Sequence, residues 1–273
     1  MKSYHSNRNK FEGTGYEMGK VTIEKEKWSE VPLLHVFTER EKNHPLPTII
    51  YMHGITSSKE HNLPIAYLLA QQGYRVILPD AMLHGEREEE VSEVALQMRF
   101  FDIIKQNLDD IEAIYEVLAS KNLIEGDRLG VAGTSMGGIS TAAALTQFSW
   151  IHSAAILMGS PKLTDFATMA INNMKEQAPD ITIPEQQVQT ILEELDEIDL
   201  SRRMETLFNR PLFFWHGEDD PIVPFDHSYS FYQAAVREYS NPDQIQFIRE
   251  ANRGHKVSRM ATNELVKWFT QQL

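Results

Sequence analysis

The sequence contains no cysteine, which excludes disulfide bonds, thiolate metal sites and a cysteine nucleophile. It also lacks any apolar run approaching the ~20 residues of a membrane-spanning helix, and residues 1–8 lack the apolar centre of a signal peptide. Basic residues are in deficit, 26 against 39 acidic ones, and the net charge of −13 argues against nucleic acid or an anionic membrane as a partner. These absences predict a soluble, cytoplasmic protein.

Strand and helix patterns alternate along most of the 273 residues, a length that fits one large domain or two small ones. Alternating apolar and charged residues at 21–28 indicate a strand near a sheet edge, expected to pair with 31–38 as a hairpin. Strands are further predicted at 48–52, 75–80, 128–132, 153–158, 211–215 and 244–249. Helices are predicted at 63–72, 92–120, 139–145, 164–175, 185–198, 226–238 and 257–272. This alternation predicts an α/β fold with a mostly parallel sheet of eight strands flanked by helices.

The alternation breaks at residues 161–210, where helical patterns follow one another without a strand between them. We expect a small helical cap inserted into an α/β core made of 21–160 and 211–273, with residues 1–20 as a loose N-terminal arm. Apolar side chains of the insertion, Phe166 among them, either line a substrate pocket or pack the insertion onto the body. The sequence favours neither alternative.

A serine flanked by glycines ends one of the predicted strands: Ser135, with Gly133 and Gly137 two positions away on either side. A nucleophile elbow needs this strand–turn–helix context, and its turn is so tight that side chains at the glycine positions would collide with the neighbouring strand and helix. By chance alone, G-x-S-x-G arises in about one chain in ten of this length. The alternative is a glycine-rich helix start without chemistry, so the motif needs partners elsewhere in the chain.

The loop after the third predicted strand opens with His53-Gly54-Ile55. Gly54 allows the backbone to approach closely, so the amide of Ile55 is expected to point at a substrate oxygen. We expect His53 to position this loop and not to transfer protons, and for His84, in the following loop, we favour loop ordering over substrate contact.

An acid and a base follow the last two predicted strands. Asp219 and Asp220 are adjacent, and the chemistry of the sequence alone does not choose between them. His255 lies in a glycine-containing loop after the last strand, from which it can fold back over the sheet edge toward Ser135. His227, only seven positions after Asp220 and within a helical pattern, suits that role less well.

The chain resembles proteins of the α/β-hydrolase fold, whose catalytic triad follows the same order along the chain: serine, then acid, then histidine. The resemblance covers nearly the whole chain from Val21 onward and is greatest to bacterial prolyl-oligopeptidase-like and dienelactone-hydrolase-like esterases. It depends on four motifs together: residues 53–55, the elbow at 133–138, residues 216–224 and residues 254–255. The family pattern places the aspartate three residues before Val-Pro, which implies Asp220 as the acid and Asp219 as a loop-capping residue. Dienelactone hydrolases proper use cysteine as the nucleophile, so the serine at this position argues against a lactone substrate.

The resemblance implies a serine hydrolase in which Ser135 attacks an acyl carbonyl, His255 takes its proton and Asp220 orients the imidazole. The amides of Ile55 and Met136 would hold the oxyanion, and no metal or organic cofactor is required. The first-choice substrates are carboxylic esters with short to medium acyl chains. Acyl-peptides, aminopeptidase substrates and acyl thioesters are alternatives, and a non-catalytic ligand receptor is the alternative outside enzymes.

Overall fold

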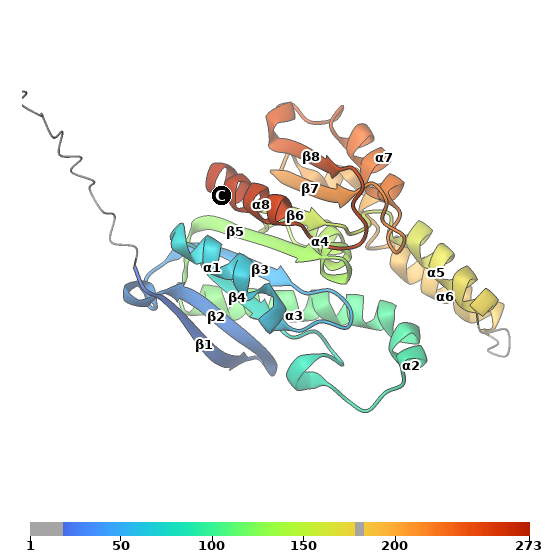
Figure 1. The fold of residues 1–273 in the computed structure, drawn as a ribbon, viewed down its shortest axis with the longest axis horizontal. Coiled ribbons are helices and arrows are strands. Elements are labelled where there is room, and N and C mark those ends of the chain that lie inside the picture. The colour runs from blue at the N-terminus through green and yellow to red at the C-terminus, as the bar shows by residue number, and fades with distance from the viewer. Residues whose placement is uncertain (1–18, 178–182) are drawn as a thin grey trace, which may run out of the picture.

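A computed structural model of the chain describes residues 19–177 and 183–273, so nearly all of the expected N-terminal arm, 1–20, lies outside the described residues. The described residues form one sheet with helices on both faces (Figure 1). Its strands are β1 Val21–Trp28, β2 Val31–Thr38, β3 Leu46–Met52, β4 Arg75–Pro79, β5 Ile124–Thr134, β6 Ser153–Leu157, β7 Leu212–Gly217 and β8 Ile245–Glu250. Its helices are α1 Leu63–Gln71, α2 Glu93–Met98, α3 Phe100–Ser120, α4 Met136–Gln147, α5 Leu163–Gln177, α6 Glu185–Asp196, α7 Phe225–Ala235 and α8 Arg259–Gln272.

The sheet has the order β1-β2-β4-β3-β5-β6-β7-β8, which confirms the predicted eight-stranded, mostly parallel architecture. β1 and β2 form the expected antiparallel hairpin, and β2 is also antiparallel to β4. All later pairings are parallel. Six strands, β3 to β8, therefore end at one edge of the sheet, where ligands of such folds collect.

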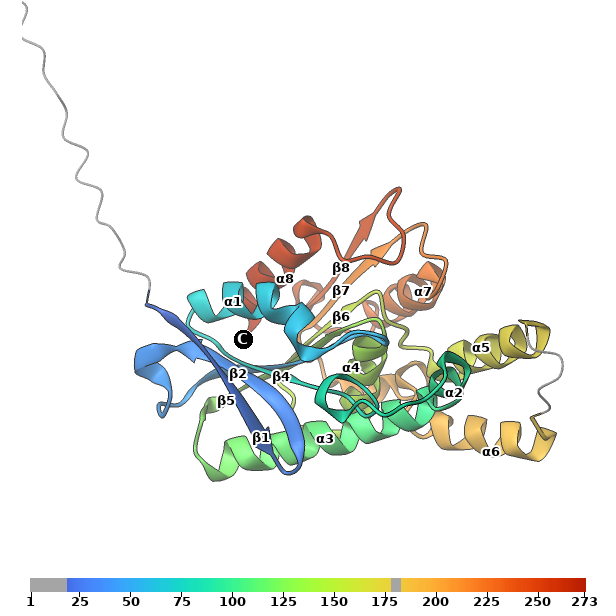
Figure 2. The same cartoon turned by 60° about the horizontal axis from the view of Figure 1, so that its bottom comes forward.

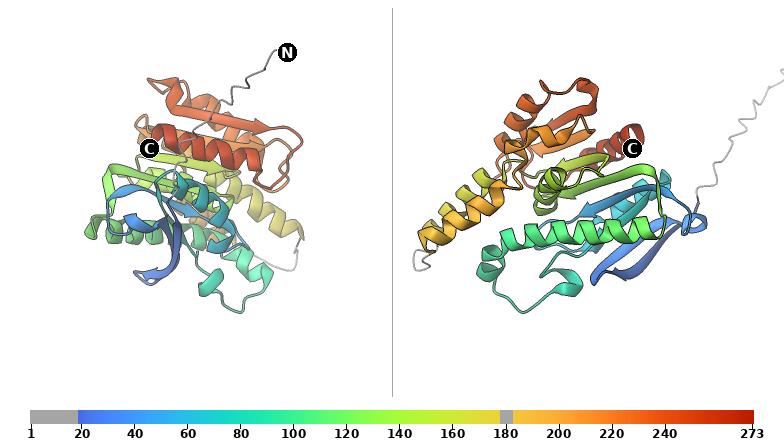
Figure 3. Two further views of the ribbon diagram at one scale, coloured as in Figure 1. Left: turned by 60° about the vertical axis from the view of Figure 1, so that its left-hand side comes forward. Right: turned by 180° about the vertical axis from the view of Figure 1, so that it is seen from behind.

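Helices cover both faces of the sheet (Figures 2 and 3). Each face carries its own apolar core. α1 and α8 cover one face, where Leu69 and Trp268 are buried. α3, α4 and α7 cover the other face with side chains such as Ile111 and Phe231. Strands buried on both faces read as continuous apolar runs, and this is why the central strands could be located from sequence.

The single helix predicted at 92–120 is wrong, because the chain forms two helices there, α2 and α3. Arg99 separates them with a ψ of 2°, and Figure 1 shows α2 turned away from the axis of α3. α3 buries a stripe of side chains, Ile103 and Ile111 among them, whereas α2 buries none. Packing on the sheet therefore fixes the axis of α3 but does not hold α2 in line with it.

The two helices between β6 and β7, α5 and α6, lie side by side and extend beyond the sheet (Figure 3). Their base is closed by two hydrogen bonds, Ser201 N to Pro161 O at 3.0 Å and Thr164 N to Asp199 Oδ2 at 2.8 Å. Phe166 is buried, with its ring centroid 5.8 Å from that of Phe100 on α3. Phe166 therefore packs these helices onto the body of the protein, which was one of the two alternatives for the apolar side chains of this segment.

A buried guanidinium joins this segment to the sheet. Arg210, just before β7, donates to the carbonyl oxygens of Leu145 at 2.5 Å, Phe148 at 2.7 Å and Leu207 at 3.2 Å. Burial lowers the pKa of Arg210 to about 10, so the side chain keeps its charge at neutral pH. A cation at the carboxyl end of α4 is also favoured by the helix dipole, and Arg210 thereby ties the end of α4 to the start of β7.

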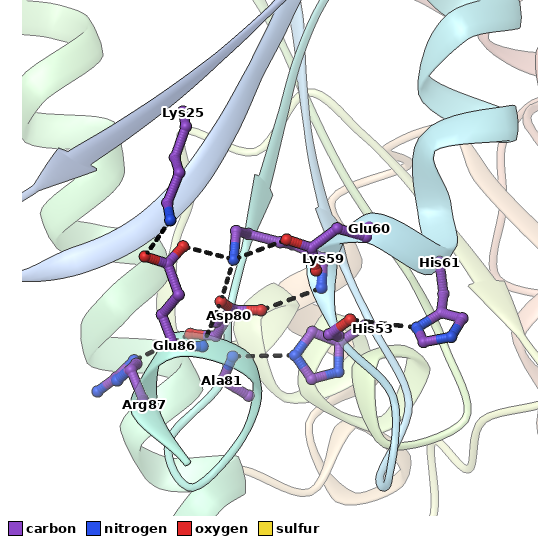
Figure 4. Close-up of polar contacts among 10 residues, drawn as sticks. Lys25, His53, Lys59, Glu60, His61, Asp80, Ala81, Glu86 and Arg87 are labelled. Carbon is purple, nitrogen blue, oxygen red and sulfur yellow. Dashed lines mark hydrogen bonds and ion pairs between the residues drawn. The ribbon is translucent and has the colours of Figure 1, made fainter.

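A buried charge cluster fixes the loops that follow β3 and β4 (Figure 4). Lys59 Nζ lies 2.5 Å from Asp80 Oδ2 and 2.7 Å from Glu86 Oε1, and the Lys59 and Asp80 side chains are 1% and 0% exposed. The Asp80 carboxylate also accepts the backbone amides of Lys59 and Glu86, each at 3.0 Å. Burial alone would lower the pKa of Lys59, but its carboxylate partners outweigh burial and raise it. The two loops are therefore held together by a lysine that stays charged.

Replacing Lys59 with methionine should destabilise the protein, because it leaves the Asp80 carboxylate buried without its cation. We expect the free energy of unfolding, measured by urea titration, to fall by about 3 kcal/mol. Glu86 provides a matched control through its second partner, Lys25, which lies 2.7 Å away and is 65% exposed.

Lys25→Met should change the free energy of unfolding by less than about 0.5 kcal/mol, as exposed ion pairs do. An equal loss of unfolding free energy in Lys59→Met and Lys25→Met would show that the buried Lys59–Asp80 pair stabilises the protein no more than the exposed Lys25–Glu86 pair does.

Candidate active site

Ser135 occupies a sharp turn between β5 and α4. Its φ of 55° and ψ of −115° are strained for a non-glycine residue, and its amide donates to Leu157 O at 2.9 Å. A Cβ on Gly137 would lie 2.1 Å from the carbonyl oxygen of Met52, and one on Gly133 would lie 2.3 Å from the backbone of Gly137. Both glycines are thus required by close backbone contact, and the turn has the geometry expected of an elbow.

The loops after β5, β7 and β8 bring three of the predicted site residues together. Ser135 Oγ lies 2.8 Å from His255 Nε2, and His255 Nδ1 lies 2.7 Å from Asp220 Oδ2. The side chain of Asp220 is 0% exposed and that of His255 is 20% exposed. The hydroxyl, imidazole and carboxylate form one chain of hydrogen bonds whose imidazole solvent can reach.

Asp220 is also bound by the turn that follows it. Its Oδ1 accepts the amides of Ile222 at 2.9 Å and Val223 at 3.0 Å, and its Oδ2 lies 3.2 Å from His216 Nε2. Burial raises the pKa of Asp220, but the hydrogen bonds from His216, His255 and the two amides outweigh burial and lower it well below its usual range. The carboxylate is therefore charged and held in one orientation.

The neighbouring candidates lie elsewhere. Asp219 is exposed, its amide donates to Arg253 O at 3.0 Å, and within the described residues its side chain takes part in no hydrogen bond. The expectation that Asp219 caps the loop is wrong, since Asp220 itself caps the turn. His227 Nδ1 lies 3.0 Å from the hydroxyl of Ser160, on the loop after β6.

Two backbone amides beside Ser135 have no acceptor within the described part of the chain, those of Ile55 and Met136. Met136 is the first residue of α4, where the helix itself offers its amide no partner. The loop of Ile55 passes close to the serine, because a Cβ on Gly54 would lie 3.4 Å from Ser135 Cβ. Unpaired amides in such a place can stabilise a developing negative charge.

The ring of His53 joins this loop to the one after β4 (Figure 4). Its Nδ1 lies 2.8 Å from the carbonyl oxygen of Gly54, and its Nε2 lies 3.0 Å from the amide nitrogen of Ala81. A carbonyl only accepts and an amide only donates, so Nδ1 carries the proton and the ring is neutral. Burial lowers the pKa of His53 to about 4. Because both ring nitrogens are engaged with backbone groups, His53 can position the loop but has no nitrogen free to exchange a proton with another molecule.

His84 makes a second, similar link. Its Nδ1 lies 2.8 Å from Met82 O, and its Nε2 accepts the amide of Thr56 at 3.1 Å. Thr56 has a φ of 60°, and the His84 ring stands edge-on to that of His53 with centroids 5.2 Å apart. Both ring nitrogens of His84 are therefore used in ordering the loops.

Sequence reasoning missed one member of the site, His216. The motif at 216–224 predicts no role for its histidine, which is fully buried at the end of β7 and contacts Asp220, Val223 and Ser228. Its position four residues before Asp220 was the available signal. Among residues 19–177 and 183–273, no group of His, Asp or Glu is placed to hold a metal ion, and no helix there is long and apolar enough to span a membrane.

The chain is similar to known proteins along most of its length. Residues 61–273 match the prolyl oligopeptidase family. "Putative esterase YitV" of Bacillus subtilis (strain 168) is 41% identical over 254 residues, which cover 93% of this chain and 100% of that protein. "Esterase YjfP" of Escherichia coli (strain K12) is 30% identical over 253 residues, with coverage of 93% and 100%.

A solved structure of low sequence identity shares the fold. TT1662 from Thermus thermophilus gives a TM-score of 0.73 at 19% identity, covering 93% of this chain and 98% of that one. The expected α/β-hydrolase fold is thereby confirmed, in agreement with the strand order. From the family match and the two sequence relatives it follows that this chain belongs to the prolyl oligopeptidase family.

Proposed function

We propose that the protein is a serine hydrolase that cleaves carboxylic esters of short to medium acyl chains. The observation that carries this proposal is the unbroken hydrogen-bond chain from Ser135 Oγ through His255 to Asp220, with links of 2.8 and 2.7 Å. The unpaired amides of Ile55 and Met136 beside the serine give it the second feature that acyl transfer needs. Both relatives that align over nearly the whole chain are named esterases, which favours an ester over other acyl substrates.

In the proposed acylation step, Ser135 Oγ attacks the ester carbonyl while His255 Nε2 accepts its proton. Asp220 fixes His255 with Nδ1 protonated, so Nε2 has the free lone pair that a base requires, and it stabilises the imidazolium that forms. The carbonyl oxygen gains negative charge as the tetrahedral centre forms, and the amides of Ile55 and Met136 stabilise it. His255 then protonates the alkoxide leaving group, which departs as an alcohol.

The acyl-serine is then hydrolysed by the reverse sequence of proton transfers. Water loses its proton to His255 Nε2 as it attacks the acyl carbonyl, the same amides hold the oxyanion, and the proton returns to Ser135 Oγ. The carboxylic acid leaves and the enzyme is regenerated. Each proton moves between the serine, the imidazole and the reacting molecules.

The side chains at this sheet edge favour an uncharged acyl group. Three apolar residues in the loops around the site remain at least partly exposed: Ile55, Met82 and Ile222, the last with 55% exposure. Segment 161–210, with α5 and α6, would act as a small cap beside them on the core formed by 21–160 and 211–273. A peptidase acting on acyl-peptides or aminopeptidase substrates is the second candidate, because the family includes oligopeptidases.

Replacing Ser135 with alanine should lower kcat/KM for p-nitrophenyl butyrate by at least about 10⁴-fold, because the nucleophile is lost while the fold is kept. A fluorophosphonate probe should label the native protein at Ser135 and leave the variant unlabelled. Ser120→Ala is the matched control, since Ser120 is exposed at the end of α3 and its hydroxyl donates to Val117 O. Unchanged ester turnover in Ser135→Ala would refute the proposed nucleophile.

The two adjacent aspartates provide an internal comparison. Asp220→Asn should reduce kcat by about 10⁴-fold, because the asparagine amide cannot stabilise the His255 imidazolium and favours the wrong tautomer of His255. Asp219→Asn should leave kcat within about twofold, since the Asp219 side chain is exposed and takes no part in the hydrogen-bond chain. Steady-state kinetics on a single ester measures both, and a larger loss in Asp219→Asn would reverse the assignment.

A substrate panel separates the alternatives. We expect kcat/KM to be highest for p-nitrophenyl acetate to octanoate, lower for the palmitate ester, and lower still for acyl-CoA thioesters and acyl-aminoacyl p-nitroanilides. The measurement is initial rates at fixed enzyme concentration, with Ser135→Ala as the blank for each substrate. If a p-nitroanilide outperformed every ester, the peptidase candidate would replace the esterase.

A further inference from the structure

The buried ring of His216 is surrounded by atoms that fix its protons. Nε2 lies 3.0 Å from the carbonyl oxygen of Val223 and 3.2 Å from Asp220 Oδ2. Nδ1 lies 3.1 Å from the hydroxyl oxygen of Ser228, on α7. A carbonyl and a carboxylate can only accept, so Nε2 carries a proton.

The hydroxyl of Ser228 decides the state of the other nitrogen. Its Oγ lies 2.5 Å from the carbonyl oxygen of Gly159, an atom that only accepts, so the single hydroxyl proton lies in that bond. Ser228 Oγ then offers only a lone pair to His216 Nδ1. Two lone pairs 3.1 Å apart in a buried site would repel, so Nδ1 must also carry a proton.

We infer that His216 is an imidazolium in the resting protein, a positioning residue whose charge neutralises Asp220 and limits how readily His255 takes a proton. The charge state of His216 follows from its contacts alone. Its effect on His255 rests on the proposed function, in which His255 is the general base.

The charge balance of the site supports the same assignment. Asp220 is fully buried, and within the described residues its ion-pairing partners are His216 and His255. His255 must be neutral to accept the proton of Ser135, so a neutral His216 would leave a buried carboxylate without any cation, which is costly. On α7, the other titratable or charged groups are Asp226, His227, Tyr229 and Tyr232. On β8 they are Glu250 and Arg249, which pairs in register with His216 and lies 3.3 Å from Glu218.

Two cations sharing one carboxylate should shape the pH profile. Protonation of His255 places a second positive charge beside the same Asp220 oxygen, so the charge on His216 opposes the protonation of His255. The neutral, active form of His255 then persists to lower pH than it would beside Asp220 alone. The cost is weaker stabilisation of the imidazolium that forms during attack by Ser135.

The first test is the pH dependence of kcat/KM for p-nitrophenyl butyrate, whose acidic limb reports the free enzyme. In His216→Gln and in Ser228→Ala, the midpoint of the acidic limb should move up by about one pH unit. The first variant removes the His216 ring and the second removes the acceptor of its Nδ1 proton, so both remove the positive charge of His216. Ser230→Ala is the matched control on the same helix, since its exposed hydroxyl bonds to Asp226 O away from the site. An acidic midpoint unchanged from wild type in both His216→Gln and Ser228→Ala would overturn the effect on His255.

The second test reads the charge of His216 directly and needs no activity. In ¹⁵N-labelled wild-type protein at pH 7.5, the His216 ring, assigned by its loss in His216→Gln, should show both nitrogens protonated. Ser228→Ala should convert one of them to an unprotonated nitrogen, and this variant carries the test if His216→Gln does not fold. A wild-type ring with one unprotonated nitrogen would overturn the inference. If Ser135→Ala retained full activity, the proposed function would fail while this result for His216 stood.

Discussion

The backbones of β3, β5 and α4 meet at the sheet edge with no space for a Cβ between them. A side chain on Gly137 would overlap the carbonyl of Met52, and one on Gly133 would overlap the first turn of α4. This contact forces Ser135 into its strained backbone angles and leaves the amide of Met136 unpaired beside it. The loop of Ile55 leaves β3 at the same point, so a single packing constraint brings the serine and both free amides together.

Buried polar groups hold the loops around the serine in place. Lys59 and Asp80 join two of them through charge, and His53 joins the same two through a neutral ring. Asp220 binds its own turn through two amides and His255 through a carboxylate oxygen. Because each of these groups is buried and has its partners, a displaced loop would expose an unsatisfied donor or acceptor, which makes displacement costly.

Features whose cause is local could be predicted from the sequence. The central strands are continuous apolar runs because both of their faces are covered, and Ser135, Asp220 and His255 occur in the order in which parallel strands deliver them to one edge. What the sequence concealed depends on contacts between distant segments. The protons of His216 are set by Gly159 and Ser228, and nothing in the local pattern links these positions.

The break between α2 and α3 was concealed for a related reason. The apolar stripe of 92–120 continues through Arg99, but only its later part meets the sheet, so periodicity alone could not locate the end of packing. For the adjacent aspartates, the family pattern implied Asp220, and the structure adds a physical reason. The amides of Ile222 and Val223 bind the Asp220 carboxylate, whereas Asp219 is exposed.

The narrow base of the α5–α6 pair has an evolutionary consequence. Pro161 and Ser201 are joined by one hydrogen bond, as are Thr164 and Asp199, so the segment leaves and re-enters the body at nearly the same place. Insertions, deletions or exchanges beyond this neck need not shift β6, β7 or the loops that carry Ser135 and Asp220. Related chains can therefore diversify the segment that extends beyond the sheet while the hydrogen-bond chain of Ser135, His255 and Asp220 stays in place, so the two parts can evolve separately.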